Sequence, residues 1–153
     1  MVEQTGSCTA VVGIMERDGL FSVANIGDSG FIVIRQHEIL IKSKEQQHGF
    51  NFPYQLGKVE GKDGKFYEHG DDRPQDCETY QLKLHEGDIV VFGSDGLFDN
   101  IWDNALLEEI NSMDSESPEK MANSLAEMAF NEAGRKDKLL IPSLISSKAN
   151  QVQ

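Results

Sequence analysis

The sequence predicts an α+β fold in which stacked β-sheets are covered by helices. Short β-rich apolar runs follow one another over residues 7–43 and return over residues 77–93, and two helical patterns come only after them. Such separation of strands and helices along the chain is typical of α+β domains. The strands are nearly continuously apolar at their centres, which indicates burial on both faces.

The first group of strands is predicted to form a β-meander, in which each strand pairs with the next. Its apolar runs span residues 8–15, 20–26, 31–35 and 39–42. Turn residues separate them: Asp18 and Gly19 after the first run, and two glycines flanking Asp28 and Ser29 after the second. Residues 36–38 give the third turn.

Residues 44–76 are polar, rich in Gly, Asp and His, and without clear periodicity. They are predicted to form a long surface loop, which in a compact domain is usually functional or disordered. Residues 77–84 alternate moderately and predict another strand. Residues 89–93 are apolar throughout and predict the central strand of a sheet.

Two amphipathic helices follow. The first is expected over residues 103–113, with Leu106, Leu107 and Ile110 on one face. The second has a strong start signal, with Ser117 as N-cap and Pro118 at the first helical position. It ends near Gly134, and its apolar stripe consists of Met121, Leu125, Met128 and Ala129.

Composition limits the class of protein. A chain of 153 residues with 39% apolar residues fits one domain with a core, and its net charge of −12 argues against nucleic acid or an anionic membrane as a partner. No apolar run approaches the roughly 18 residues that a membrane span needs. Cys8 and Cys77 are far apart and have no metal-binding spacing, so they are expected to be reduced thiols.

The most informative motif is Ser-Asp-Gly-Leu-Phe-Asp at residues 94–99, directly after the apolar run 89–93. If a helical turn begins there, Asp95 and Asp99 lie on one face, within reach of a shared hard cation. Alternatively, Asp95 caps a helix and Asp99 is a solvated acid of the first turn. The hexapeptide alone leaves both interpretations open.

Asp28 is a further candidate, because it ends a strand between two glycines and could project into the same cleft as Asp95. Taken alone, this motif favours plain turn chemistry. Residues 6–10 (Gly-Ser-Cys-Thr-Ala) indicate little beyond close packing. The chain has no glycine-rich phosphate loop and no dinucleotide fingerprint, and its four histidines lack zinc spacing.

Together these segments resemble the metal-dependent serine/threonine phosphatases of type 2C. The matching pieces stand in the family's order: residues 6–10, residues 24–30 (Ala-Asn-Ile-Gly-Asp-Ser-Gly), and Gly87-Asp88 leading into residues 94–99. Residues 45–48 (Glu-Gln-Gln-His) with residues 51–57 resemble the narrower branch that includes mitochondrial and plastid members. The resemblance covers about residues 6–134.

This resemblance implies a β-sandwich of two antiparallel sheets flanked by helices. It also implies a site for Mg²⁺ or Mn²⁺, with hydrolysis of phosphoserine and phosphothreonine in a phosphoprotein substrate by a metal-activated water. By its match to the family motif, Asp95 is the expected direct ligand of the metal pair. Asp99 and Asp28 match positions that look like a third, weaker metal site or like support for the first ligands.

The chain also departs from the family pattern. The acidic residue and the Asp-Gly-x-Gly-Gly segment that precede the first motif are absent, as is the Asp-Asp segment of the final strand. The expectation is therefore a partial catalytic domain at residues 1–135, truncated at both ends, with a divergent tail at residues 136–153. Such a chain is expected to be marginally stable.

An alternative function is a catalytically inactive pseudophosphatase or regulatory fragment. It would bind a partner protein through residues 44–76, or a partner chain that completes the fold. The branch resemblance points to a mitochondrion or plastid, and otherwise the expected location is the cytoplasm. No nucleic acid or membrane is expected among the partners.

Overall fold

The computed structural model describes residues 5–60, 62–63, 65–68, 72–113 and 115–135. In chain order the elements are β1 (Gly6–Cys8), β2 (Ala10–Met15), β3 (Leu20–Ile26), β4 (Gly30–Arg35), β5 (Glu38–Lys42), β6 (Gln47–Gly49), β7 (Phe52–Pro53), β8 (Leu56–Glu60), β9 (Phe66–Glu68), the 3-10 helix η1 (Pro74–Asp76), β10 (Glu78–Lys83), β11 (Ile89–Gly93), α1 (Asp95–Phe98), α2 (Asp103–Ser112) and α3 (Pro118–Ala133). The predicted tail at residues 136–153 lies outside the described residues.

Two antiparallel three-stranded sheets stack on each other and confirm the predicted sandwich. Their strand orders are β10-β3-β2 and β11-β4-β5. Between them lies a buried cluster of Phe21, Val23, Phe31 and Val33. The Phe21 and Phe31 rings meet edge to face, with centroids 6.2 Å apart, a favoured geometry for aromatic pairs.

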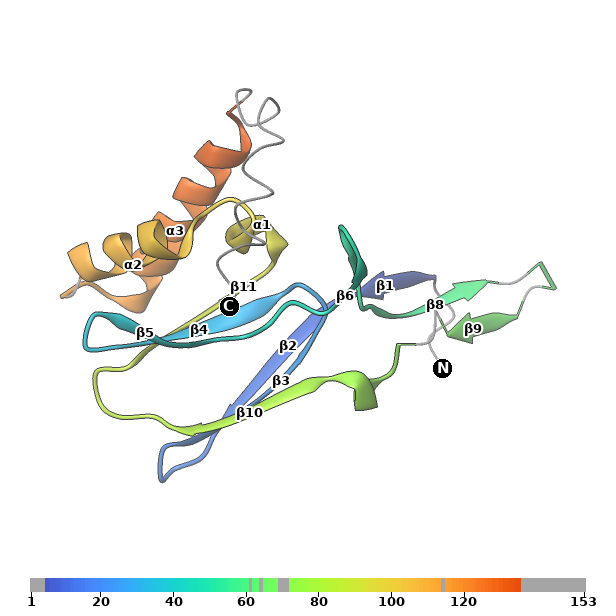
Figure 1. Cartoon of the computed structure of the whole chain (residues 1–153), viewed down its shortest axis with the longest axis horizontal. Helices are drawn as coiled ribbons and strands as arrows, with labels where there is room; N and C mark the ends of the chain where they lie inside the picture. The colour runs from blue at the N-terminus through green and yellow to red at the C-terminus, as the bar shows by residue number, and fades with distance from the viewer. Residues whose placement is uncertain (1–4, 61, 64, 69–71, 114, 136–153) are drawn as a thin grey trace.

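Helices cover the outer face of the β11-β4-β5 sheet, as Figure 1 shows above β4 and β5. Side chains alternate along β4, so that Phe31 and Val33 face the other sheet while Ile32 and Ile34 face the helices. Leu106 and Ile110 of α2 and Leu125 of α3 complete this second core. Burial of β4 on both faces was predicted and is confirmed.

The helix signals are also confirmed. Helix α2 spans Asp103–Ser112, and α3 spans Pro118–Ala133. The Ser117 side chain accepts a hydrogen bond from the Lys120 amide at 3.4 Å, and Gly134 is the C-cap. Met121, Leu125 and Ala129 are buried against the sheet.

The predicted central position of residues 89–93 is wrong. Among the described strands, β4 lies in the middle of its sheet and β11 lies at the edge, paired only with β4. Burial on both faces also fails for β2, an edge strand in which Val12 and Ile14 are 59% and 64% exposed. An apolar run indicates a strand but does not reveal its position in the sheet.

The predicted long loop at residues 44–76 is also wrong, because this segment contains β6, β7, β8, β9 and η1. Strand β8 lies between β1 and β9 in a third sheet, and β6 pairs with β7 in a small ribbon. These strands have two to five residues and too little pattern to predict. Their pairing is partly nonlocal, as in the register between Ser7 and Gly57.

Candidate functional site

The two aspartate motifs meet because of the β4–β11 register. Gly30 at the start of β4 pairs with Gly93 at the end of β11. Asp28 lies two residues before Gly30, and Asp95 lies two residues after Gly93. Antiparallel pairing therefore brings the β3–β4 turn and the start of α1 to the same end of the sandwich.

Asp95 and Asp99 belong to one helical turn, as predicted. Asp95 is the first residue of α1, and the Asp99 amide donates to the Asp95 carbonyl oxygen at 2.8 Å. Ser94 occupies the N-cap position, so the interpretation of Asp95 as the cap is wrong. Both carboxylates lie on exposed residues, and Asp95 Oδ1 accepts from the adjacent Gly96 amide at 2.7 Å.

A close fit against β11 holds α1 in place. A Cβ atom at Gly93 would lie 2.6 Å from Leu97 Cδ2 and 3.0 Å from the Phe98 ring, so a larger residue here would force these side chains to shift. Phe98 is buried in the core beneath the helices. The Lys42 ammonium lies over the Phe98 ring, with Nζ 5.3 Å from the ring centroid. The same ammonium forms an ion pair with Asp103, at 2.6 Å.

Asp28 is half-buried and lies within electrostatic reach of the other two carboxylates. Burial raises the pKa of Asp28 above its ordinary value, and repulsion from Asp95 and Asp99 adds to the effect. A divalent cation bound near Asp28 would offset the repulsion that Asp95 and Asp99 exert on it. Within the described part of the chain, no three His, Cys, Asp or Glu side chains already lie close enough together to hold a metal ion.

The first motif, residues 6–10, packs directly on the second. The Thr9 and Ser29 hydroxyl groups are 2.7 Å apart, which ties the residue after Asp28 to the β1–β2 junction. Gly27 has φ +90°, and a Cβ atom there would lie 2.4 Å from Thr9 Cγ2 and 2.6 Å from the Tyr54 carbonyl oxygen. The small residues that seemed to mean only close packing therefore shape the turn that carries Asp28.

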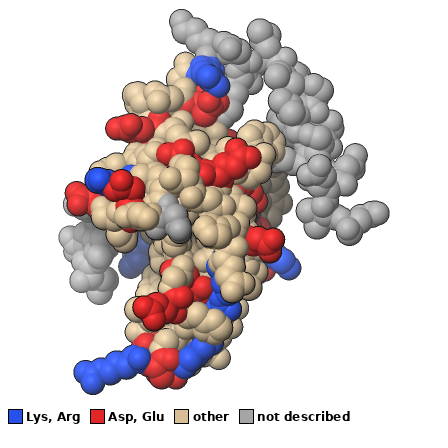
Figure 2. Space-filling model, turned by 90° about the vertical axis from the view of Figure 1, so that its left-hand side faces the viewer, with Lys and Arg blue, Asp and Glu red and all other residues tan. Residues whose placement is uncertain are grey.

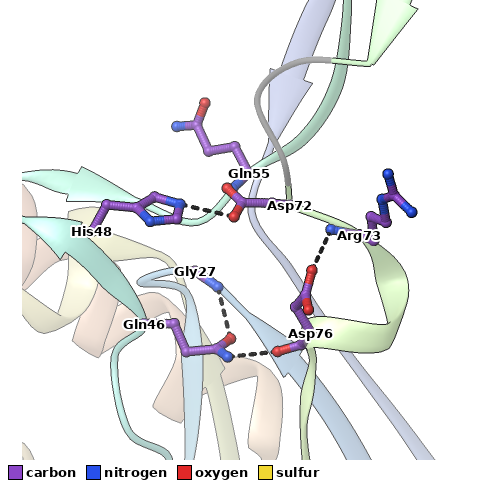
Figure 3. Close-up of polar contacts among 7 residues, drawn as sticks. All are labelled: Gly27, Gln46, His48, Gln55, Asp72, Arg73 and Asp76. Carbon is purple, nitrogen blue, oxygen red and sulfur yellow. Dashed lines mark hydrogen bonds and ion pairs between the residues drawn. The ribbon is translucent and has the colours of Figure 1, made fainter.

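Sequence reasoning did not identify Gln46 as part of this region. Figure 3 shows its side chain between Gly27 and Asp76, with a hydrogen bond to the backbone of each. The same view shows His48 paired with Asp72, whose Oδ1 lies 2.8 Å from His48 Nε2. The His48 ring also stacks on Tyr54, with ring centroids 4.0 Å apart. The only earlier signal was that residues 45–48 belong to a recognisable motif.

Gly87-Asp88, which precedes the third motif, is structural. Arg35 holds the Asp88 carboxylate with two hydrogen bonds of 2.8 Å and 2.6 Å, and the His85 amide donates to it at 2.8 Å. The Arg35 bond is the main cause that lowers the pKa of Asp88 to about 2, and the Asp88 side chain is only 3% exposed. This ion pair joins β4 to the turn before β11.

A groove of about 940 Å³ lies between β11 and α3. Val91, Leu125 and Ala129 are among the residues that line it, and most of its surface is apolar. Such a lining does not suit a charged ligand, whereas exposed carboxylates such as those of Asp95 and Asp99 suit a cation. Asp28, Asp95 and Asp99 therefore stay the candidate residues for cation binding.

Acidic side chains are spread over the face shown in Figure 2, with basic side chains between them. This distribution agrees with a net charge of −12 and marks no single basic patch on that face. In the described part of the chain no helix is long and apolar enough to cross a membrane.

Comparison with known proteins identifies the family. The chain is 40% identical over 129 residues to a PTC7 homologue, "fig", of Drosophila willistoni, 38% identical over 126 residues to probable protein phosphatase 2C 1 of Oryza sativa subsp. japonica, and 36% identical over 129 residues to the PTC7 homologue of Homo sapiens. Each match covers 81% of this chain but only 40%, 34% and 41% of the relative. No family model matches the chain.

Solved structures agree. The photosystem II phosphatase PBCP is 35% identical, with a TM-score of 0.67 over 82% of this chain and 45% of that chain. The catalytic domain of the serine/threonine phosphatase PstP, solved with two manganese ions, has a TM-score of 0.55 over 84% of this chain and 53% of that chain. At 17% identity, PstP supports the fold alone.

The stacked antiparallel sheets, the helices on one face and these matches define the class: the chain belongs to the type 2C family of protein phosphatases. Within that family its relatives include the PTC7 homologues of insects and vertebrates. The chain spans less than half the length of the curated relatives named here.

Proposed function

We propose that this chain forms part of a metal-dependent phosphatase that hydrolyses phosphoserine and phosphothreonine in proteins. The observation that carries the proposal is the β4–β11 register, which brings Asp28, Asp95 and Asp99 to one end of the sandwich, where Asp95 and Asp99 help to raise the pKa of Asp28. Because the chain covers 34–41% of these relatives, the activity, substrate and partners are all part of the proposal.

The donor set fits Mg²⁺ or Mn²⁺, since carboxylate oxygens are the ligands that these hard cations prefer. Asp95 would be a direct ligand, at an exposed position on the first turn of α1. Asp99, one turn further on, and the half-buried Asp28 would hold a weaker site or support the first. The manganese ions of PstP belong to a fold neighbour and agree with this choice of metal.

When bound, such cations lower the pKa of a coordinated water and neutralise the phosphoryl oxygens of the substrate. The chain's own residues orient the ligands: Gly93 lets α1 lie against β11, and Gly27 fixes the sharp turn before Asp28. With a net charge of −12, the protein needs this local neutralisation to accept a phosphoprotein.

We further propose a location in a mitochondrion or plastid. One match with 35% identity is a photosystem II phosphatase by name, which supports an organellar location. The inactive regulatory role is less well supported, because the relatives carry phosphatase names.

The test is hydrolysis of an aryl phosphate and of a phosphoserine peptide by the purified chain, with Mn²⁺ and with EDTA. Asp95→Asn should abolish metal-dependent turnover and leave the circular dichroism spectrum unchanged. The matched control is Glu127→Gln, the same acid-to-amide change on an exposed residue of α3, which should keep full activity. Turnover that survives Asp95→Asn would overturn the assignment of Asp95, and folded wild-type chain without turnover would favour the regulatory role.

A further inference from the structure

Residues 43–46, which we call the strap, run beside the turn that carries Asp28. At one end of the strap, the Ser43 amide donates to the Phe31 carbonyl oxygen, and Ser43 Oγ accepts from the Phe31 amide, both at 2.9 Å. Phe31 lies three residues after Asp28. The strap is therefore attached to the chain on the C-terminal side of the turn.

At the other end, Gln46 is attached on the N-terminal side. Its amide donates to the Gly27 carbonyl oxygen at 2.9 Å, and its side-chain Oε1 accepts from the Gly27 amide at 3.3 Å. Its Nε2 donates to the Asp76 carbonyl oxygen at 2.7 Å, so the same side chain also joins η1 (Figure 3). Asp28 thus lies between two attachment points of one strap.

The turn has little freedom to move away from these contacts. Gly27 is buried at φ +90°, with Thr9 and the Tyr54 carbonyl oxygen close on the side where a Cβ would be. The Thr9–Ser29 hydroxyl pair restrains the residue after Asp28. Gln46 bonds both the amide and the carbonyl of Gly27, so it restrains the backbone directly before Asp28.

We propose that Gln46 is a positioning residue, whose side chain fixes the Gly27–Asp28 turn so that the Asp28 carboxylate faces Asp95 and Asp99. The inference rests on the proposed function, since it gives Asp28 a role in cation binding. It gives a role to Gln46, which lies in residues 45–48, a segment that the proposed chemistry does not otherwise use. Groups that orient metal ligands typically change metal affinity by 10- to 100-fold when they are removed.

A purely structural role for Gln46 would be to hold the β6–β7 ribbon. The ribbon, however, is attached by backbone groups: the Tyr54 amide donates to the Gln46 carbonyl oxygen at 3.0 Å, and the Gln46 amide donates to Gly27. A side-chain substitution leaves both bonds in place. The positioning and ribbon-holding roles can therefore be separated by experiment.

The variant is Gln46→Met, which keeps the length of the side chain and removes its two hydrogen bonds. The matched control is Gln47→Met, the same change at the next residue, whose exposed side chain donates a hydrogen bond to Glu45 at 3.1 Å. Two quantities are measured on the 153-residue chain. They are amide hydrogen exchange at Gly27 and Asp28 without metal, and Mn²⁺ affinity from the electron paramagnetic resonance signal of free Mn²⁺.

We expect Gln46→Met to speed exchange of the Gly27 amide about fivefold, as loss of one ordinary hydrogen bond implies. We expect it to weaken Mn²⁺ binding about tenfold, while Gln47→Met changes neither quantity. Wild-type Mn²⁺ affinity in Gln46→Met would overturn the inference and leave the proposed function standing. If the folded wild-type chain binds no Mn²⁺ at all, the proposed function is overturned, and this inference with it.

Discussion

Gly30 of β4 pairs with Gly93 of β11, and at both positions a Cβ atom would lie too close to a neighbouring side chain. A Cβ atom on Gly93 would lie 2.6 Å from Leu97 Cδ2, and one on Gly30 would lie 2.3 Å from Ser43 Oγ. The pair therefore lets α1 and the strap approach the strand ends at one place.

Gly93→Ala should push α1 away from β11, because the new methyl group overlaps Leu97 and Phe98. Overpacking of this kind costs about 1–3 kcal/mol, and the shift should also weaken Mn²⁺ binding through Asp95. Urea unfolding and Mn²⁺ titration measure the two effects. Gly49→Ala is the control, since nothing lies within 4 Å of its Cβ position. Equal effects of the two substitutions would contradict the proposed fit.

Asp28→Asn should stabilise the metal-free chain at neutral pH. The pKa of Asp28 is raised by burial and by repulsion from Asp95 and Asp99, so the folded state holds this proton more tightly than the unfolded state does. In the wild type, stability therefore falls as pH rises through the window above the ordinary Asp pKa of 3.8. The amide side chain introduced by Asp28→Asn carries no titrating proton, so the variant does not lose stability as the pH rises through this window.

Thermal unfolding with EDTA and with Mn²⁺ checks this prediction. The variant should melt above the wild type in EDTA, and it should gain less from added Mn²⁺ because a carboxylate ligand is gone. A variant that melts below the wild type in EDTA would show that the Asp28 carboxylate has a stabilising partner instead.

Asp88→Asn should destabilise the fold by about 2 kcal/mol, since it weakens charged hydrogen bonds of a nearly buried carboxylate. In the wild type the pKa of Asp88 is lowered to about 2, mainly by Arg35. The stabilisation is complete above the unfolded pKa of 3.8 and is lost as pH falls through about 2. Wild type and variant should therefore converge in urea midpoint as pH falls through this window. Asp18→Asn, which removes an exposed pair with Lys83, should leave the midpoint almost unchanged.

Leu125→Ala should cost about 3 kcal/mol, because it leaves a cavity between α3 and the sheet. Leu125 is 3% exposed in the core that it shares with Ile32 and Leu106. Phe130→Ala on the same helix is the control: Phe130 is 80% exposed, and its loss should change stability by less than about 0.5 kcal/mol. A similar cost at both positions would contradict the packing of α3.

Much of this fold could be predicted from local pattern. Strand β3 lies where its apolar run predicts, and Ser117 and Pro118 begin α3 as their residue types indicate. Position within a sheet could not be predicted in the same way, as the edge location of β11 demonstrates. The small strands β6 to β9 escaped notice because they have only two to five residues and little apolar pattern, and β8 also takes its second partner, β1, from far away in sequence.

The three candidate residues could be named from the sequence, whereas the contacts that support them could not. Asp95 and Asp99 follow from helical spacing, and Asp28 from a motif that the β4–β11 register brings beside them. Gln46 lies in a polar segment, and its side chain bonds backbone groups. Every residue has these groups, so the sequence does not show which residue Gln46 would bind. The metal assignment of the three aspartates itself stays a prediction, which the experiments above address.

The pairing of β1 with β8 also has a consequence for the order in which the chain folds. Strands β2 to β5 are joined by short turns, whereas β1 and β8 must close a loop in which Ser7 and Gln55 are 48 residues apart. Closing a longer loop carries a larger entropic penalty and delays contact formation. Thr9 directly precedes Ala10, which pairs with Ile26, so Thr9 reaches Gly27 with the local β2–β3 hairpin, whereas Tyr54, two residues before β8, reaches Gly27 only across a longer stretch of chain. We therefore expect a newly synthesised chain to form the local β2–β3 hairpin first and to restrain the Asp28 turn fully only in a later stage, when β1 pairs with β8.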